Sequence, residues 1–177
     1  MIGVTGPSDF VIKYDTRTFT EMGRAAVGKD AHVSLARQDD QLFVPCQVTN
    51  EVVVLNRETL TRETSIPIPG AHGAGMARNG RWFYTTNLPG GGTNGMFAID
   101  TDSNTIIGST NTPFSVPHNI ELTPDGRKLY LTHSGANNKV TIYTVSHRNP
   151  VPVLVGEVTV GSNPFGIEFV PAASEDD

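Results

Sequence analysis

The sequence predicts an all-β fold built from a repeated four-stranded unit. Short runs rich in Val, Ile, Thr, Tyr and Phe alternate with scattered Gly and Pro, a pattern typical of strands joined by turns. No stretch has the apolar stripe of a helix, since even the best candidate, residues 25–37, mixes glycine, aspartate and β-branched residues. We therefore expect little or no helix.

The repeat is visible when three histidines are aligned. His32, His72 and His118 each begin a stretch that matches the other two without a gap. The same two turn positions then hold Asp39-Asp40, Asn79-Gly80 and Asp125-Gly126. Asn-Gly and Asp-Gly favour a two-residue hairpin turn in which both residues have positive φ. Each histidine is therefore predicted to begin the first strand of a hairpin.

A fourth copy begins at Asn163, where Phe165 takes the histidine position. From His32 through His72 and His118 to Phe165, the equivalent positions are 40, 46 and 47 residues apart. The second, third and fourth strands of this copy are predicted at the other end of the chain, at Gly3 to Thr5, Phe10 to Asp15 and Glu21 to Val27. Four antiparallel strands repeated about every 45 residues are typical of β-propeller blades. We expect one domain over residues 1–177, with four blades closed by the C-terminal strand joining the N-terminal blade, or half of a larger ring.

Three motifs carry a resemblance to a known family: Tyr84-Thr-Thr-Asn87, Pro124-Asp-Gly126 and Gly161-Ser-Asn-Pro-Phe-Gly166. They resemble the YVTN-type β-propeller repeat, which is similar to the propellers of surface-layer proteins, lactonase-like proteins and the N-terminal domain of nitrous oxide reductase. The resemblance implies the fold and leaves the activity open, because such propellers host many functions. It also implies a periplasmic or extracellular location. The Asn at the end of the second strand is Asn87 here, but it is Gln47 and His133 in the other copies.

The composition and charge argue against some classes of binding partner. The net charge of −5 comes from 18 acidic against 13 basic residues, and no stretch gathers Lys and Arg on one face, which argues against nucleic acid and anionic membranes. No apolar run is long enough for a membrane span, and the first thirteen residues lack the pattern of a signal peptide. Cys46 is the only cysteine and is predicted to be a small apolar residue on a strand.

The histidines are the candidate site. Innermost strands line the central channel of a propeller, so His32, His72 and His118 are predicted to converge there. Three imidazoles can bind zinc or copper and leave one position open for water or substrate. The hairpin turns place Gln47, Asn87 and His133 directly opposite the three histidines in turn, so these residues could form a second shell. The resemblance supports this hypothesis, since nitrous oxide reductase and some periplasmic metal-binding propellers use histidines that converge on the channel.

Other interpretations remain open. Each histidine could merely cap its own loop and recur because the repeat was duplicated, or one could act as a general base. Phe165 favours a three-ligand site, because a purely stabilising histidine would be expected in the fourth copy too. The leading hypothesis is a metal-binding propeller, with no other cofactor. The alternatives are a protein-interaction or cell-surface scaffold and a lactonase-like hydrolase, for which no catalytic residue stands out. Two chains could also exchange closing strands and form a homodimer with an eight-bladed ring.

Overall fold

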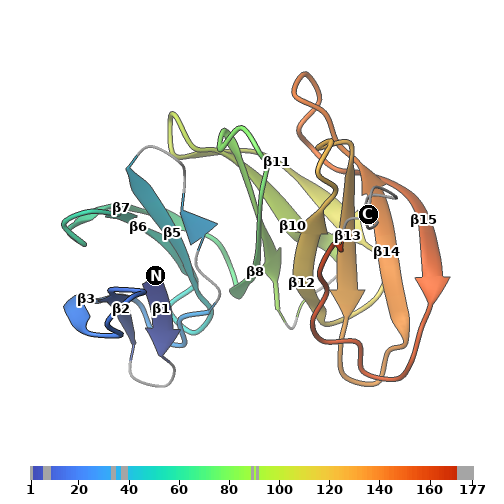
Figure 1. Ribbon diagram of the computed structural model, residues 1–177. Coiled ribbons are helices and arrows are strands. Elements are labelled where there is room, and N and C mark those ends of the chain that lie inside the picture. Colours follow the sequence, from blue (N-terminus) through green and yellow to red (C-terminus); the bar gives the residue numbers. More distant parts are fainter. Residues whose placement is uncertain are drawn as a thin grey trace, which may run out of the picture.

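The computed structural model describes residues 2–5, 9–32, 35–36, 40–88, 90 and 92–170, in which all regular structure is strand (Figure 1). The strands form four antiparallel sheets. The first has three strands, β1 (Ile2–Thr5), β2 (Phe10–Tyr14) and β3 (Glu21–Ala26). The second contains β4 (Leu35–Ala36), β5 (Gln41–Cys46), β6 (Glu51–Asn56) and β7 (Arg62–Pro67). The third contains β8 (Ala71–Met76), β9 (Trp82–Asn87), β10 (Gly92–Asp100) and β11 (Thr105–Thr112). The fourth contains β12 (Pro117–Leu122), β13 (Lys128–His133), β14 (Lys139–Thr144) and β15 (Val153–Thr159).

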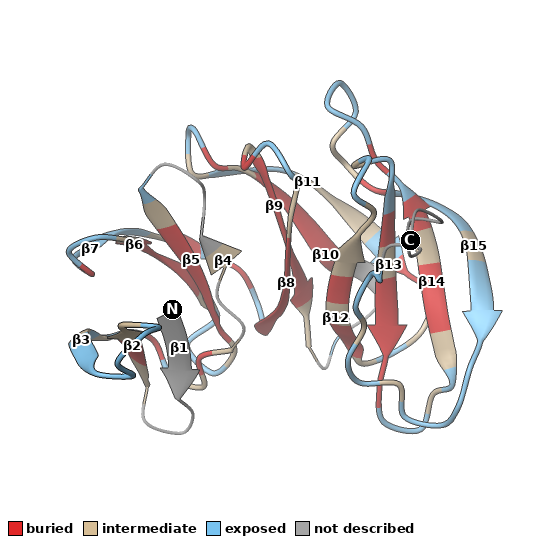
Figure 2. Cartoon of the chain, viewed as in Figure 1, coloured by how far each residue is buried: buried red, intermediate tan, exposed pale blue. Residues whose placement is uncertain are grey.

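Strands follow one another in each sheet in chain order, as predicted for blades. The first strands of neighbouring sheets lie together, with β4 and β5 beside β8 and β8 beside β12. The fourth strands, β7, β11 and β15, lie on the outside and expose at least half of their residues (Figure 2). The sheets are thus stacked in an arc, with the histidine-bearing strands on its inner side.

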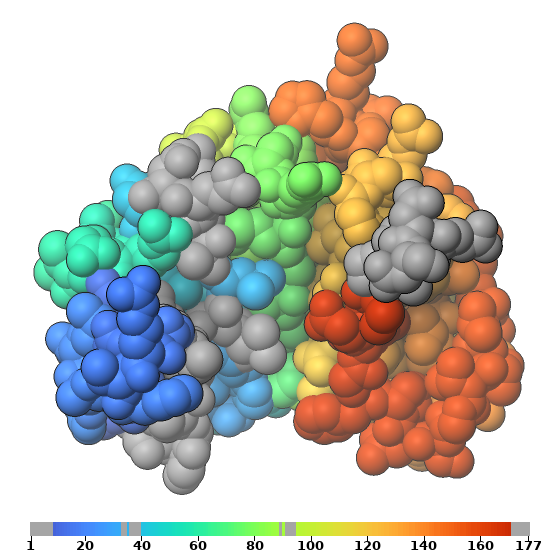
Figure 3. All heavy atoms as spheres, in the orientation of Figure 1, coloured from blue at the N-terminus to red at the C-terminus, as the bar shows by residue number. Residues whose placement is uncertain are grey.

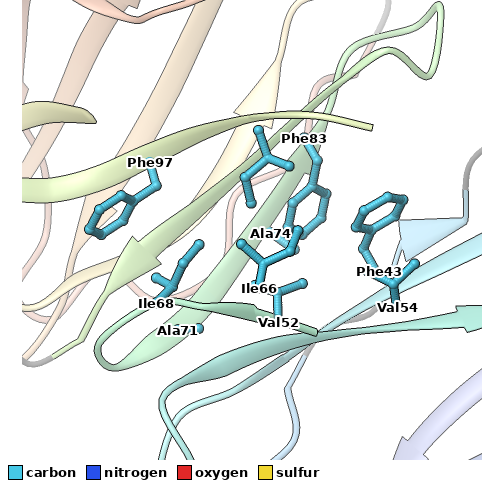
Figure 4. Close-up of a cluster of buried hydrophobic side chains, with 10 residues drawn as sticks. Phe43, Val52, Val54, Ile66, Ile68, Ala71, Ala74, Phe83 and Phe97 are labelled. Atoms are coloured by element: carbon cyan, nitrogen blue, oxygen red, sulfur yellow. The ribbon is translucent and has the colours of Figure 1, made fainter. Parts of the chain in front are cut away.

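Apolar clusters between neighbouring sheets stabilise the stack. The cluster between the second and third sheets contains Phe43 and Phe83, whose ring centroids are 5.1 Å apart (Figure 4). Along β6, Val52 and Val54 pack into this cluster, while Val53 and Leu55 pack into the cluster toward the first sheet. A strand that is covered on both faces needs apolar side chains on both. This explains why the sequence of β6 is a continuous apolar run.

The hairpin turns differ from the prediction. Gly80 and Gly126 have φ of 72° and 65°, but Asn79 and Asp125 do not have positive φ. Only the glycine of each pair is therefore in the left-handed region, and Asp39 lies outside the described residues. The Asn79 and Asp125 side chains instead accept hydrogen bonds from the backbone N–H two residues later, at 3.1 and 3.0 Å. These Asx turns satisfy the local backbone without a second residue of positive φ.

The first sheet and residues 160–170 lie at opposite ends of the arc. Residues near the N-terminus (blue) and residues 160–170 (red) are well separated in Figure 3. Within the described residues, β1 is an edge strand, and residues 160–170 form no strand and contact β13 and the loop after it instead. The structure therefore does not show ring closure within the chain. No helix able to cross a bilayer is found in the described part of the chain.

Candidate functional site

The three predicted histidines lie next to one another on the inner side of the arc. The ring centroids of His32 and His72 are 3.7 Å apart, and those of His72 and His118 are 4.3 Å apart. Phe165 continues the series, with its ring centroid 3.9 Å from that of His118. We call the rings of His32, His72 and His118 the histidine row. Its order follows the order of the repeats, because His72 and His118 lie at the start of the innermost strands β8 and β12, and His32 lies shortly before β4.

A hydrogen bond joins two members of the row. Nε2 of His72 lies 3.0 Å from Nε2 of His118, and Nδ1 of His72 lies 3.0 Å from Oε1 of Gln47. The Gln47 oxygen can only accept, so the proton of the neutral His72 ring is on Nδ1. Nε2 of His72 then accepts, and His118 donates through its own Nε2–H. Nδ1 of His118 is left as a buried lone pair without a hydrogen-bond partner.

Burial keeps these rings neutral. The pKa of His72 is lowered from 6.5 to about 3, first by burial and then by the charges that His32 and His118 would carry. The pKa of His118 is lowered as well, mainly by burial. His72 and His118 are only 6% and 5% exposed. At neutral pH both rings therefore offer lone pairs that protons do not occupy, which is the form that binds metal ions.

His32 is more open than its neighbours. Its Nε2 lies 3.2 Å from Oδ1 of Asp30, but without the geometry of a hydrogen bond, and the atom is buried without a hydrogen-bond partner. Within the described residues, no group of three or more His, Cys, Asp or Glu side chains is arranged to hold a metal ion. The nitrogens of His72 and His118 thus meet in this structure, while the His32 ring lies tilted against that of His72.

A β-bulge at two of the histidines changes the predicted pairing. Ala71 pairs with Asn87 and Pro117 pairs with His133, and the ladders resume at Ala74 and Ile120 after a register shift. His72 and His118 are therefore not directly opposite Asn87 and His133, as the turn arithmetic predicted. A bulge sets two residues against one and turns a side chain in a new direction. Because His72 and His118 lie in bulges, their rings can meet across two different sheets.

Threonine hydroxyls join each bulge to the segment that packs beside it, which is β12 for the first bulge and residues 160–170 for the second. Oγ1 of Thr86 accepts from the N–H of Gly73 at 2.8 Å and donates to the carbonyl of His118 at 3.3 Å. Oγ1 of Thr132 accepts from the N–H of Asn119 at 3.0 Å and donates to the carbonyl of Phe165 at 3.0 Å. Sequence reasoning missed these residues. The available signal was a threonine immediately before the last residue of the second strand in two repeats.

Gly73 allows the histidine-bearing strands to approach. A Cβ atom on this residue would lie 1.8 Å from the carbonyl oxygen of His118, so only glycine fits.

The residue two positions before each histidine of the row, and before Phe165, has a positive φ. Asp30, Gly70, Val116 and Asn163 have φ of 57°, 59°, 53° and 55°, which places the same left-handed residue at the start of all four copies. For Val116, a β-branched residue, this conformation is strained.

The predicted second-shell residues have different surroundings. Gln47 holds His72, from the neighbouring repeat, instead of His32. His133 is fully buried, with Nε2 2.9 Å from Oγ1 of Thr141 and Nδ1 3.3 Å from the carbonyl of Ser115, and burial lowers its pKa. No hydrogen bond joins Asn87 to a histidine in the described part of the chain. Only Gln47 therefore has the kind of contact that a second shell requires.

A cavity of about 370 Å³ lies beside the row, between β8, β12 and residues 167–168. It is lined by Met76, Asn119, Glu121 and Glu168, among others. Burial and the nearby Glu168 carboxylate raise the pKa of Glu121.

Cys46 is buried, and burial raises its pKa to about 11, so it is not an activated nucleophile.

No protein-family model matches the sequence, and no curated protein matches it either. The resemblance to the YVTN repeat therefore stays a prediction. Solved structures do match. The hydrazine synthase of Kuenenia stuttgartiensis has a TM-score of 0.76 at 19% identity, over 88% of this chain and 45% of that one. A protein of unknown function from Desulfotomaculum acetoxidans has a TM-score of 0.78 at 16% identity, over 95% and 54%.

A proposed 6-phosphogluconolactonase from Bacteroides fragilis has a TM-score of 0.73 at 16% identity, over 96% of this chain and 59% of that one. At such low identity these likenesses concern the fold alone. The chain spans about half the length of the structures it matches. Its four antiparallel sheets have the arrangement found in about half of a β-propeller chain.

Proposed function

We propose that this protein is a binding propeller whose histidine row holds a zinc or copper ion on the inner side of the arc. The observation that carries the proposal is the 3.0 Å separation between Nε2 of His72 and Nε2 of His118. Two nitrogens bound to one tetrahedral zinc ion at about 2.0–2.1 Å are roughly 3.3 Å apart. A small outward movement of the two rings, with the proton of His118 moving from Nε2 to the unpartnered Nδ1, would therefore exchange their hydrogen bond for two bonds to one ion.

His32 is the third ligand in this proposal. Its ring already contacts that of His72, at an interplanar angle of 47°, and its Nε2 has no hydrogen bond to lose. It must turn from Asp30 toward the other two nitrogens, because the three do not converge in the structure described above. Gln47 would keep its hydrogen bond to Nδ1 of His72 and fix that ring, as second-shell residues do for zinc-bound histidines. When bound, the ion would supply an open position for water or a small ligand.

Metal analysis tests the proposal. Protein made without a His-tag is dialysed against Zn²⁺ or Cu²⁺, and the bound metal is measured by mass spectrometry. We expect one ion per chain in the native protein and in His147→Ala, whose histidine is exposed and outside the row. We expect little metal in the combined variant His32→Ala, His72→Ala, His118→Ala. Equal and substoichiometric metal in the native and triple-variant proteins would contradict the proposal.

Single variants test the ligand set. Replacing a metal-binding histidine removes a bond that the other two cannot replace, so His32→Ala, His72→Ala and His118→Ala should each weaken Zn²⁺ binding by at least about tenfold. A competition titration against a chromophoric chelator measures this. Unchanged affinity in His32→Ala, together with loss in the other two variants, would limit the site to two histidines and contradict the three-ligand proposal.

Lactone hydrolysis is a second candidate. The observation that favours it is the cavity beside His118, where Glu121 has a raised pKa and can serve as a proton donor. One of the matched structures is itself a proposed 6-phosphogluconolactonase. A pH-stat assay with simple lactones tests this candidate. Turnover that is lost in Glu121→Gln would support it, and no turnover above the buffer rate, with or without added Zn²⁺, would contradict it.

A further inference from the structure

Residues 163–170 occupy the position of an innermost strand. The carbonyl of Phe165 accepts a hydrogen bond from Thr132, as the carbonyl of His118 accepts one from Thr86. Asn163 has the positive φ found two residues before each histidine. The Phe165 ring lies against that of His118 at an interplanar angle of 45°, much as the His32 ring lies against that of His72 at 47°. The segment is therefore placed on the fourth sheet in the way that β12 is placed on the third.

This segment has no sheet of its own. Residues 164–170 form no strand, and Phe165 is 60% exposed. Phe169 and Val170 are exposed as well. An innermost strand without its hairpin partner leaves backbone donors and acceptors unpaired on that edge.

The first sheet, by contrast, lacks an innermost strand in the described part of the chain. In β2, β6 and β10, the turn that follows the strand is closed by the side chain of Asp15, Asn56 or Asp100, each of which accepts from the backbone N–H two residues later. This common feature identifies β2 as a third strand of the repeat and β1 as a second strand. Within the described residues, β1 is at the edge of its sheet and no innermost strand pairs with it.

We propose that a second copy of this chain fills both gaps. Residues 163–170 of each copy would pair with β1 of the other, and the two arcs would close into one ring of eight sheets. The spare strand and the sheet that lacks one lie at opposite ends of the arc, which is where a second copy can meet them (Figures 1 and 3). Strand addition to a free edge is a common mode of association.

Two further observations favour a second copy as the occupant. This chain covers 45% to 59% of the matched propeller structures, so its arc corresponds to about half of a ring and leaves room for a second arc. The new contact would also repeat the sheet-on-sheet packing that already joins neighbouring sheets within the chain. It would cover Phe165 and Phe169.

The mass in solution tests this proposal. We expect twice the 19.0 kDa chain mass by light scattering across a wide range of concentrations, in the presence of a chelator so that metal binding has no influence. Ile167→Pro removes a backbone donor from the pairing segment, and Phe169→Asp places a charge in the contact. Both variants should give the monomer mass. Val155→Lys, on the exposed strand β15, should remain dimeric and so excludes association through that apolar edge.

Hydrogen exchange at the backbone of β1 provides a second measurement. The amide groups of β1 that face away from β2 should be protected in the native protein and should lose that protection in Phe169→Asp, while β8 and β9 stay protected in both. A monomeric native chain would overturn the proposal. So would dimers that survive in both Ile167→Pro and Phe169→Asp, or that dissociate in Val155→Lys.

Discussion

Nε2 of His72 lies 3.0 Å from Nε2 of His118, although the two residues are 46 positions apart and belong to different sheets. Both rings are buried, and one must donate to the other for the pair to be satisfied. The contact depends on three neighbouring features: the bulges that contain the two histidines, the Thr86 hydroxyl that joins the sheets, and the missing side chain at Gly73. Each can be tested separately.

Thr86→Val should destabilise the protein, while Thr85→Val should not. The Thr86 hydroxyl bridges the N–H of Gly73 and the carbonyl of His118, so its loss leaves a buried donor unsatisfied at a cost of about 1–3 kcal/mol. The neighbouring Thr85 hydroxyl is buried without a hydrogen-bond partner, so a methyl group there should be neutral or stabilising. Urea denaturation measures both, and equal effects of the two changes would contradict the assigned bridge.

Gly73→Ala should open the contact between β8 and β12. Its Cβ would lie 1.8 Å from the His118 carbonyl oxygen, so the strands must separate, and we expect a loss of stability of at least about 2 kcal/mol. Gly156→Ala is the matched control, because a Cβ at Gly156 has no neighbour within 4 Å. It should be neutral or slightly stabilising, since alanine restricts the unfolded chain. If Gly73→Ala were as stable as this control, the close approach would not exist in solution.

Stability should decrease as the pH falls below about 6.5. The folded-state pKa of His72 is about 3, against 6.5 for a free histidine, so between these values the unfolded chain binds a proton that the folded chain does not. Above pH 6.5 both states are neutral and the contribution is constant. The lowered pKa values of His118 and His133 act in the same direction.

The measurement is the free energy of unfolding across this pH range. Each such histidine contributes a slope of up to about 1.4 kcal/mol per pH unit. His72→Gln should reduce the slope, because glutamine does not titrate, whereas His147→Gln should leave it unchanged. A native protein whose stability is flat from pH 7 to about pH 4 would contradict the neutral, buried state of the row.

Val116→Asn should stabilise the protein. Val116 has a φ of 53°, a conformation that β-branched residues avoid and asparagine tolerates. We expect a gain of about 1 kcal/mol in the free energy of unfolding. The same change at Val155, on the exposed strand β15, should be neutral or destabilising, because asparagine is disfavoured in strands. A loss of stability in Val116→Asn would show that the valine side chain packs well enough to outweigh the strain.

Much of the fold could be predicted because its signals are local. The expected strands at Gly3 to Thr5, Phe10 to Asp15 and Glu21 to Val27 correspond to β1, β2 and β3 within a residue or two. Each is bounded by turn residues and needs no information from the rest of the chain. The turn type was wrong because Asn79 and Asp125 use their side chains to satisfy the backbone, and an Asn-Gly or Asp-Gly pair does not reveal that choice.

The candidate site likewise has features that the sequence predicts and features that only the tertiary structure decides. The spacing of the repeats by itself determined that His32, His72, His118 and Phe165 form one series, because equivalent positions of stacked repeats lie side by side. Only the tertiary structure decided that two of these rings share a hydrogen bond while His32 turns toward Asp30. The same is true of the contact between Gln47 and a neighbouring repeat. These relationships depend on bulges, on the close approach at Gly73 and on burial, all of which arise where sheets pack together and none of which a local pattern encodes.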